Sequence, residues 1–317
     1  MIFRFSLYGF LKNQRYFEPF LILAFLQKDL DFTSIGLLAG FREICVNILE
    51  VPSGALADSF GRKKTITAGF FSYSVSFIIF GLSSSLLYLY FAMFLFSIGE
   101  AFRTGTHKAM IFDYLEQNGR SGEKTEIYGY TRSWSKAGSA VSVLIGAASV
   151  FFLRDYSTIF LISAFPCFLN MLNLASYPAA LDYSSDDATS IKAVFKNLIS
   201  SVKFSLTHKP LRKLIFESMN FEGLYKSSKD FVQPVIRNAA LALPVLASVT
   251  GRQKTAILTG AVFFFMHTLS AAASRNAGRT VRYFKGQEDR AAYFLWIVFL
   301  ISFILMGSGI LANTSWV

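Results

Sequence analysis

Apolar stretches of about twenty residues recur along the whole chain and are separated by short polar intervals. Stretches of this length can cross the hydrocarbon core of a bilayer as α-helices. The pattern predicts about nine spans, at residues 5–27, 33–56, 65–83, 86–111, 131–153, 157–179, 211–236, 254–274 and 291–312. We therefore expect an all-α, polytopic membrane protein.

The longest polar interval separates six of these predicted helices from the last three. It begins near Leu181, contains the sequence DYSSDDATS and ends in basic sequence near Lys209. The pattern predicts three regions: a six-helix bundle over 1–180, a central cytoplasmic loop over 181–210, and a C-terminal bundle of about three helices over 211–317.

The composition supports a membrane protein and argues against a soluble one. Hydrophobic residues make up 53% of the 317 residues and charged residues 16%, whereas soluble domains carry about 25% charged residues. The net charge of +11 does not indicate nucleic acid, because the cations lie in short clusters between apolar segments. Cys45 and Cys167 both fall in apolar segments, without metal-ligand spacing, and are interpreted as packing residues.

The distribution of cations predicts the orientation. With the N-terminus inside, 19 of the 31 Lys and Arg residues fall on the inner side and 5 on the outer side, and the rest lie within spans. Because Lys and Arg accumulate on the cytoplasmic side of membrane proteins, we expect a cytoplasmic N-terminus, in the plasma (inner) membrane.

The turn between the second and third predicted spans has the sequence GALADSFGRKK, residues 54–64. Gly54 would let two helices approach closely, Asp58 could pair with Arg62, and Gly61 allows backbone conformations that a β-carbon would strain. The cations alone would also fit an ordinary cytoplasmic flank. The full spacing, including Lys63, resembles the signature Gly-x-Leu-Ala-Asp-Arg-x-Gly-Arg-Lys of the major facilitator superfamily.

The resemblance implies a cytoplasmic gating role for Gly54, Asp58, Gly61, Arg62 and Lys63. Members of that family commonly have twelve helices in two halves of six, whereas this sequence supplies six and about three, so we expect a truncated product or a fragment. Ser59 stands where the signature usually has arginine.

Charged residues within predicted spans are the candidates for function, because an unpaired charge in a bilayer costs at least a few kcal/mol. Polar residues at helical spacing form stripes on four spans, which predicts one shared aqueous cavity for substrate and protons. Fixed structural ion pairs between helices are the alternative. The predicted cavity residues are Arg15, Glu18, Glu43, Asn47, Glu50, Glu100, Arg103, His107, Glu222, Lys226, Lys229 and Gln233.

The spacing also suggests which of these acids are paired. Arg15 and Arg103 lie one turn from Glu18 and Glu100, respectively, and would hold those acids ionised. Glu43 and Glu50 are the better candidates for carrying a proton, because Arg42 is adjacent to Glu43 and adjacent helix residues point apart.

Three further cavity residues have open roles. Glu222 and Lys226 could form an ion pair that substrate binding breaks. His107 could relay protons, although a single membrane histidine is more often a hydrogen-bonded structural residue.

These features predict a secondary transporter that moves a small polar or charged solute by alternating access, with proton coupling as a hypothesis. The alternative is a truncated, non-transporting membrane protein that acts as a sensor or a partner-binding scaffold. The predicted partners are a small-molecule solute, protons and the lipid bilayer, and not nucleic acid. No cofactor or metal site is expected, and no catalytic constellation is readable, so an enzyme is disfavoured.

Overall fold

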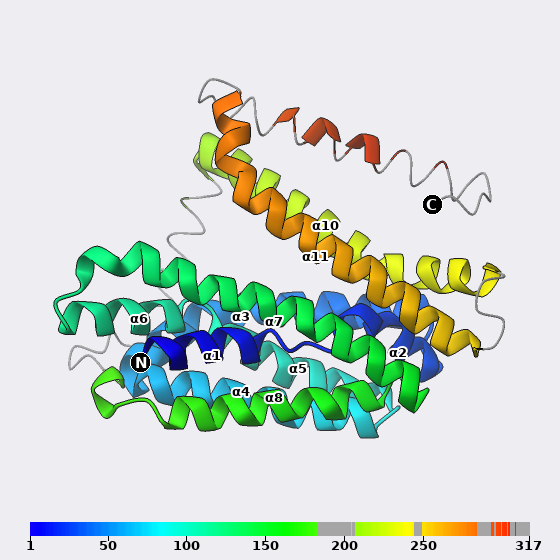
Figure 1. Ribbon diagram of the computed structural model, residues 1–317, viewed down its shortest axis with the longest axis horizontal. Coiled ribbons are helices and arrows are strands. Elements are labelled where there is room, and N and C mark those ends of the chain that lie inside the picture. The colour runs from blue at the N-terminus through cyan, green and yellow to red at the C-terminus, as the bar shows by residue number, and fades with distance from the viewer. Residues whose placement is uncertain are drawn as a thin grey trace.

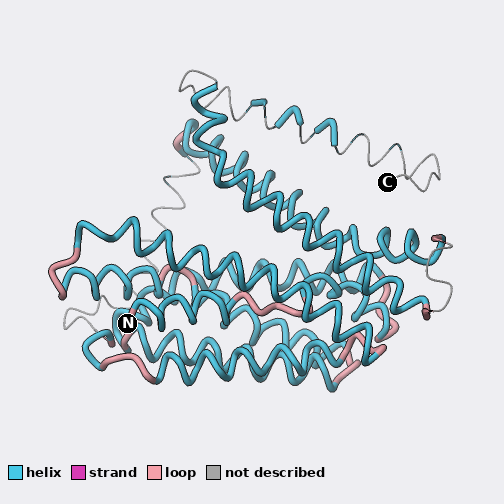
Figure 2. The backbone as a smooth tube through the Cα atoms, in the orientation of Figure 1, coloured by secondary structure: helices cyan, strands magenta, loops and turns pink. Residues whose placement is uncertain are grey.

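The structure is a computed structural model that describes residues 1–182, 204, 207–243, 249–283, 293, 294, 296–298, 300–302, 304 and 308 (Figure 1). The elements defined among these residues are all helices (Figure 2). In chain order they are α1 (Ile2–Lys12), η1 (Glu18–Phe20), α2 (Leu21–Gln27), α3 (Phe32–Phe60), α4 (Arg62–Leu82), α5 (Leu86–Arg103), α6 (Thr106–Gln117), η2 (Ser121–Glu123), α7 (Lys124–Leu153), α8 (Thr158–Ala175), η3 (Ala179–Leu181), α10 (Lys209–Ala242) and α11 (Gly251–Tyr283).

Five helical stretches in the described part of the chain are long and apolar enough to cross a membrane. They are Phe32–Glu50, Arg62–Leu82, Leu86–Gln117, Glu126–Leu153 and Thr158–Ala175. The predicted central loop and the predicted span at 291–312 lie largely outside the described residues. The total of nine spans therefore stays a prediction.

The first predicted span, 5–27, is not one helix. α1 ends at Lys12, residues 13–17 are non-helical, and the chain resumes as η1 and then α2. The side chain of Asn13 donates to the carbonyl of Gly9 at 2.7 Å, which satisfies a carbonyl that would otherwise lack a partner at the end of α1. Pro19 has no N–H and disfavours α-helical geometry at Glu18, which instead begins the short 3-10 helix η1. Together these residues account for the break.

The fourth predicted span, 86–111, is also broken. α5 ends at Arg103 and α6 begins at Thr106 after Gly105, whose φ is +74°. Glycine adopts positive φ without the steric penalty that a β-carbon brings. Because the helix restarts here, Glu100 and His107 do not lie on one continuous helical face, so the polar stripe predicted on this span is interrupted.

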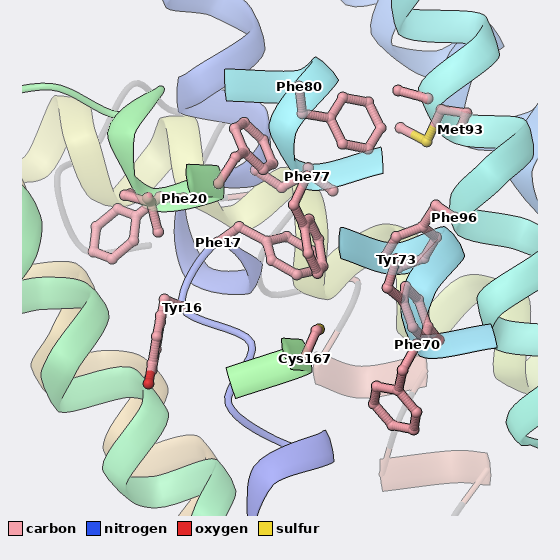
Figure 3. Close-up of a cluster of buried hydrophobic side chains, with 14 of the residues drawn as sticks. Tyr16, Phe17, Phe20, Phe70, Tyr73, Phe77, Phe80, Met93, Phe96 and Cys167 are labelled. Carbon is pink, nitrogen blue, oxygen red and sulfur yellow. The ribbon is translucent and has the colours of Figure 1, made fainter. Parts of the chain in front are cut away.

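Aromatic side chains from three segments fill the centre of the bundle (Figure 3). Phe17 lies beside Phe77 of α4 at 5.0 Å between ring centroids, and Tyr73 lies edge-on to Phe96 of α5 at 5.1 Å. All four residues are buried. Offset and edge-to-face pairs of this kind stabilise beyond simple burial. This aromatic cluster supports Phe17 within the non-helical segment.

Two glycines of α7 allow that helix to pack closely on α1 and the non-helical segment. A β-carbon at Gly138 would lie 2.5 Å from the carbonyl oxygen of Phe10, and one at Gly146 would lie 2.6 Å from that of Tyr16. Small residues at such positions let helix backbones approach where van der Waals contact drives association. The break in the first helix is therefore held from both sides, by aromatic rings and by α7.

α10 and α11 pack against each other and against the N-terminal bundle. α11 crosses α7 obliquely (Figure 1), and α10 contacts α2 and η1. Val143 of α7, Ile236 of α10 and Phe263 of α11 form a small buried cluster at the junction. This packing brings α10 beside the break in the first helix.

Candidate functional site

A cavity of about 170 Å³ lies between the broken first helix, α3, α5 and α10. Phe17 and Phe96 of the aromatic cluster form part of its wall. Its charged lining residues are balanced, with four bases and four acids. They are Arg15, Arg42, Lys226 and Lys229, and Glu18, Glu43, Glu100 and Asp230.

Glu100 of α5 joins two guanidinium groups. Its Oε1 accepts from Arg15, and its Oε2 accepts from Arg103 at 2.5 Å. The exposed fractions of the side chains are 16% for Glu100, 25% for Arg15 and 19% for Arg103, so water screens these charges only partly. Arg15 was expected to pair with Glu18 one helical turn away, but it binds Glu100 because residues 13–17 are not helical.

Glu18 instead forms an ion pair with Lys229 of α10. The amide of Gln233, one turn further along α10, makes two bonds to the broken helix: its Nε2 donates to the carbonyl of Glu18 and its Oε1 accepts from the N–H of Ile22, both at 2.9 Å. Gln233 is fully buried. Its side chain therefore holds backbone groups left without helical partners at the break.

Glu43 of α3 is bound by two cations, which corrects the sequence interpretation. Arg42 approaches Glu43 Oε1 at 2.8 Å, and Lys226 of α10 approaches Oε2 at 3.4 Å. Adjacent Cβ atoms on a helix do diverge. The long Arg42 side chain nevertheless reaches back, because both residues border the same cavity. Glu43 is thus not the isolated carboxylate that the sequence suggested.

Among the described side chains, the other predicted cavity residues do not line this cavity. Asn47 is exposed and donates to the carbonyl of Glu43 at 2.7 Å, and Glu50 is also exposed. His107 is buried elsewhere, stacked on Tyr8 at 3.6 Å. The side chain of Glu222 lies outside the described part of the structure, so its predicted pairing with Lys226 stays untested.

Two lining residues were absent from the predicted set. They are Arg42 and Asp230, which were not included among the cavity residues predicted from the sequence. A charge within a predicted span was the available signal for both. No cluster of His, Cys, Asp and Glu suited to a metal ion occurs among the residues that the structure describes.

The turn at residues 54–64, predicted to be cytoplasmic and to act in gating, lies at the junction of α3 and α4. Gly61 has φ +98° and caps α4, and a β-carbon there would lie 2.3 Å from a carboxylate oxygen of Asp182. That carboxylate accepts from the backbone N–H groups of Lys63 and Lys64 at 3.0 and 3.3 Å. Asp182 therefore binds the positive end of α4.

Of the remaining signature residues, Gly54 differs from the expectation, and the predicted pairing of Asp58 with Arg62 stays untested. Arg62 forms an ion pair with Asp113 of α6, whereas the side chain of Asp58, its predicted partner, is outside the described part. Lys63 donates to the carbonyls of Ala175 and Tyr177 at 3.0 and 2.7 Å. No atom lies within 4 Å of a β-carbon built on Gly54, so the expected close helix approach is not seen there. The turn ties α4 to α6 and to the end of α8.

Long apolar helices around a charged cavity, with ion pairs between helices, define a polytopic integral membrane protein. The sequence model of the Major Facilitator Superfamily matches residues 13–317. The chain therefore belongs to this superfamily, as the turn at residues 54–64 suggested, and has its all-α fold.

Two curated relatives are themselves named as uncharacterized transporters. YxaM of Bacillus subtilis (strain 168) is 34% identical over 90 residues, which are 28% of this chain and 23% of YxaM. MJ1317 of Methanocaldococcus jannaschii is 26% identical over 216 residues, which are 67% of this chain and 52% of MJ1317. The chain thus matches about half the length of MJ1317 and less of YxaM.

Two solved structures share the fold. The nucleoside transporter NupG (D323A mutant) aligns with a TM-score of 0.67 at 14% identity, covering 86% of this chain and 68% of NupG. The peptide transporter POT in complex with sulfate aligns with a TM-score of 0.56 at 14% identity, covering 90% of this chain and 69% of POT. At this identity the likeness concerns the fold alone.

Proposed function

We propose that the chain acts in secondary transport of a small polar, charged or zwitterionic solute by alternating access. The observation that carries this proposal is the cavity with four acids and four bases between the broken first helix, α3, α5 and α10. Buried charge in a membrane protein is costly unless it is paired or meets water, so such a cavity is a functional site by default. Membership of the superfamily is consistent with this function.

The ion pairs around the cavity suggest how substrate binding would couple to movement. Lys229 and Lys226 of α10 contact Glu18 and Glu43 on the N-terminal bundle. Both pairs connect α10 to the N-terminal bundle, and alternating access would move these two parts relative to each other. A zwitterionic solute could supply an ammonium to the acids and a carboxylate to the lysines, and so replace both pairs as they separate.

Proton coupling is the finer part of the proposal, and Asp230 is its best candidate. Glu18, Glu43 and Glu100 each contact a cation in this structure, whereas Asp230 lines the cavity with no hydrogen bond or ion pair among the described residues. A carboxylate without a bound cation is the easier one to protonate. We therefore place Asp230 ahead of Glu43 and Glu50 as the proton carrier.

The test is solute uptake by the full chain in sealed vesicles with an imposed pH gradient. We expect the gradient to drive uptake in the wild type and in Glu116→Gln, a control carboxylate on α6 outside the cavity. Asp230→Asn should abolish the response to the gradient and still bind solute. If the rate of uptake does not change with the pH gradient in any of the three proteins, proton coupling is rejected. Folded protein that transports none of a broad solute panel would favour the sensor or scaffold role instead.

The proposed orientation places the N-terminus on the cytoplasmic side of the plasma (inner) membrane. Its support is the excess of cations on one side of the predicted spans. Asn118→Cys and Asp29→Cys put thiols at exposed positions that this orientation assigns to opposite sides. A membrane-impermeant maleimide added to intact cells should label Asp29→Cys and leave Asn118→Cys unlabelled. The reverse pattern would invert the assigned orientation.

A further inference from the structure

A second cavity, of about 220 Å³, shares no lining residue with the first. It is bordered by α1, the α5–α6 connection and α7. The N-terminus of the chain and α6 lie at the same end of the bundle (Figure 1). None of the cross-helix pairs to α10 borders this space, so its chemistry is separate from that of the proposed transport cavity.

The charges around this second cavity are all of one sign. Lys12, Arg103, Lys108 and Arg132 line it, and no carboxylate does. The carboxylate of Glu100 binds Arg103 and Arg15, and it borders the first cavity. Cations that converge on a concave site bounded by protein create a strongly positive potential, which favours an anion there.

Hydrogen-bond donors at the buried and the exposed parts of the second cavity favour an oxyanion as its ligand. The Nε of Arg103 is buried and has no hydrogen-bond partner among the described residues. The N-terminus of the 12-residue helix α6 is beside it, capped by Gly105 without a side-chain bond. A guanidinium N–H without a partner and a helix N-terminus without a side-chain cap both suit a phosphate-like group. Lys108 and Arg132 are exposed and would contact the ligand from the solvent side.

We propose that this second cavity binds a phosphate-type oxyanion, either a free phosphate or small phosphate monoester, or the headgroup of an anionic lipid. A water occupies about 30 Å³ in the liquid, so the cavity has room for a phosphate group with several waters. Four cations match a dianion better than they match a single carboxylate. The binding does not depend on whether the chain transports a solute.

The test is thermal unfolding of the purified full chain in detergent, titrated with inorganic phosphate at constant ionic strength. A ligand that binds only the folded state raises the unfolding temperature as its concentration increases. We expect stabilisation of the wild type and a loss of affinity of about tenfold or more in Arg132→Gln, because one charge-assisted bond is removed. Arg132→Lys should keep most of the affinity. Arg237→Gln, which removes one exposed cation of α10 outside both cavities, should behave as the wild type does.

The source of the phosphate group is decided by repeating the measurement in nanodiscs. If phosphatidic acid stabilises the wild type and not Arg132→Gln, while inorganic phosphate has no effect, the ligand is a lipid headgroup. If neither probe stabilises the wild type, or if Arg132→Gln and Arg237→Gln respond alike to both probes, the proposed site is wrong. Because Arg132 is exposed, its replacement should leave the fold intact.

Discussion

Replacing Glu100 with glutamine removes the carboxylate that Arg15 and Arg103 share. The two guanidinium groups would then face each other without their common acid. The three side chains are only 16–25% exposed, so water can compensate little. Breaking a buried ion pair by removing one partner costs about 3–5 kcal/mol, whereas an exposed pair contributes about 0–1 kcal/mol. We expect Glu100→Gln to lower the free energy of unfolding by about 3 kcal/mol.

The chain supplies a matched control for this prediction. Arg120 and Glu123 form an ion pair at 2.6 Å with the same three-residue spacing as Glu100 and Arg103, but their side chains are 38% and 43% exposed. Because water screens this exposed pair, Glu123→Gln should lower the free energy of unfolding far less than Glu100→Gln does. The two variants make the same chemical change and differ in the burial of the pair.

A second substitution distinguishes the loss of the ion-pair contact from the cost of leaving two buried cations unpaired. Adding Arg15→Gln to Glu100→Gln removes one of the two unpaired cations and should restore about 1 kcal/mol or more. The assay is unfolding in mixed micelles with increasing dodecyl sulfate, followed by tryptophan fluorescence and circular dichroism. The reasoning is refuted if Glu100→Gln and Glu123→Gln lose equal stability, or if the double variant is less stable than Glu100→Gln.

Three smaller predictions use the same unfolding assay. Gln233→Leu should lower the free energy of unfolding by about 2–4 kcal/mol, because it leaves a backbone N–H and a carbonyl at the helix break unpaired; a loss below about 1 kcal/mol would contradict this. Asp182→Ala should cost about 0.5–2 kcal/mol through the lost α4 cap, and Asp182→Asn should recover part of it. Burial acts to raise the pKa of Asp155, between α7 and α8, but hydrogen bonds from Thr158 and Gln27 outweigh it and hold the pKa below its usual value. The ionised Asp155 therefore contributes its full stabilisation near neutral pH, and this contribution is lost as the pH falls through the lowered pKa. The difference in free energy of unfolding between wild type and Asp155→Asn should shrink below about pH 4 and stay constant above about pH 6.

The hydrophobic pattern was sufficient for most of the helices in the N-terminal bundle. The predicted spans 33–56, 65–83 and 157–179 correspond to α3, α4 and α8, because long apolar runs in a bilayer must satisfy their backbone groups as helices. The pattern failed at residues 13–17 and 104–105, because one continuous helix was predicted across each of these segments and the helix is interrupted there. The first break involves Asn13 and Pro19 and the second involves Gly105, and mean hydropathy does not record their side-chain hydrogen bonds or backbone preferences.

The site was predictable as a set of charges and not as a set of pairs. Helical spacing correctly joined Glu100 to Arg103, which are on one unbroken helix. It wrongly joined Arg15 to Glu18, because the chain between them is not helical. The contacts of Lys229 and Lys226 across to the N-terminal bundle depend on how α10 packs, which no local spacing encodes.

The break in the first helix explains why the charges around the cavity fall into two groups. On an unbroken helix, Arg15 and Glu18 would share a face and could neutralise each other. The break turns Arg15 toward α5, where Glu100 and Arg103 complete a set that lies wholly within the N-terminal bundle. It turns Glu18 toward α10, where Lys229 binds it from the other part of the molecule. If α10 moves relative to the bundle, the first group stays paired, whereas Glu18 and Glu43 lose lysines. Solute binding should therefore depend on Glu18 and Glu43, and stability of the bundle on Glu100.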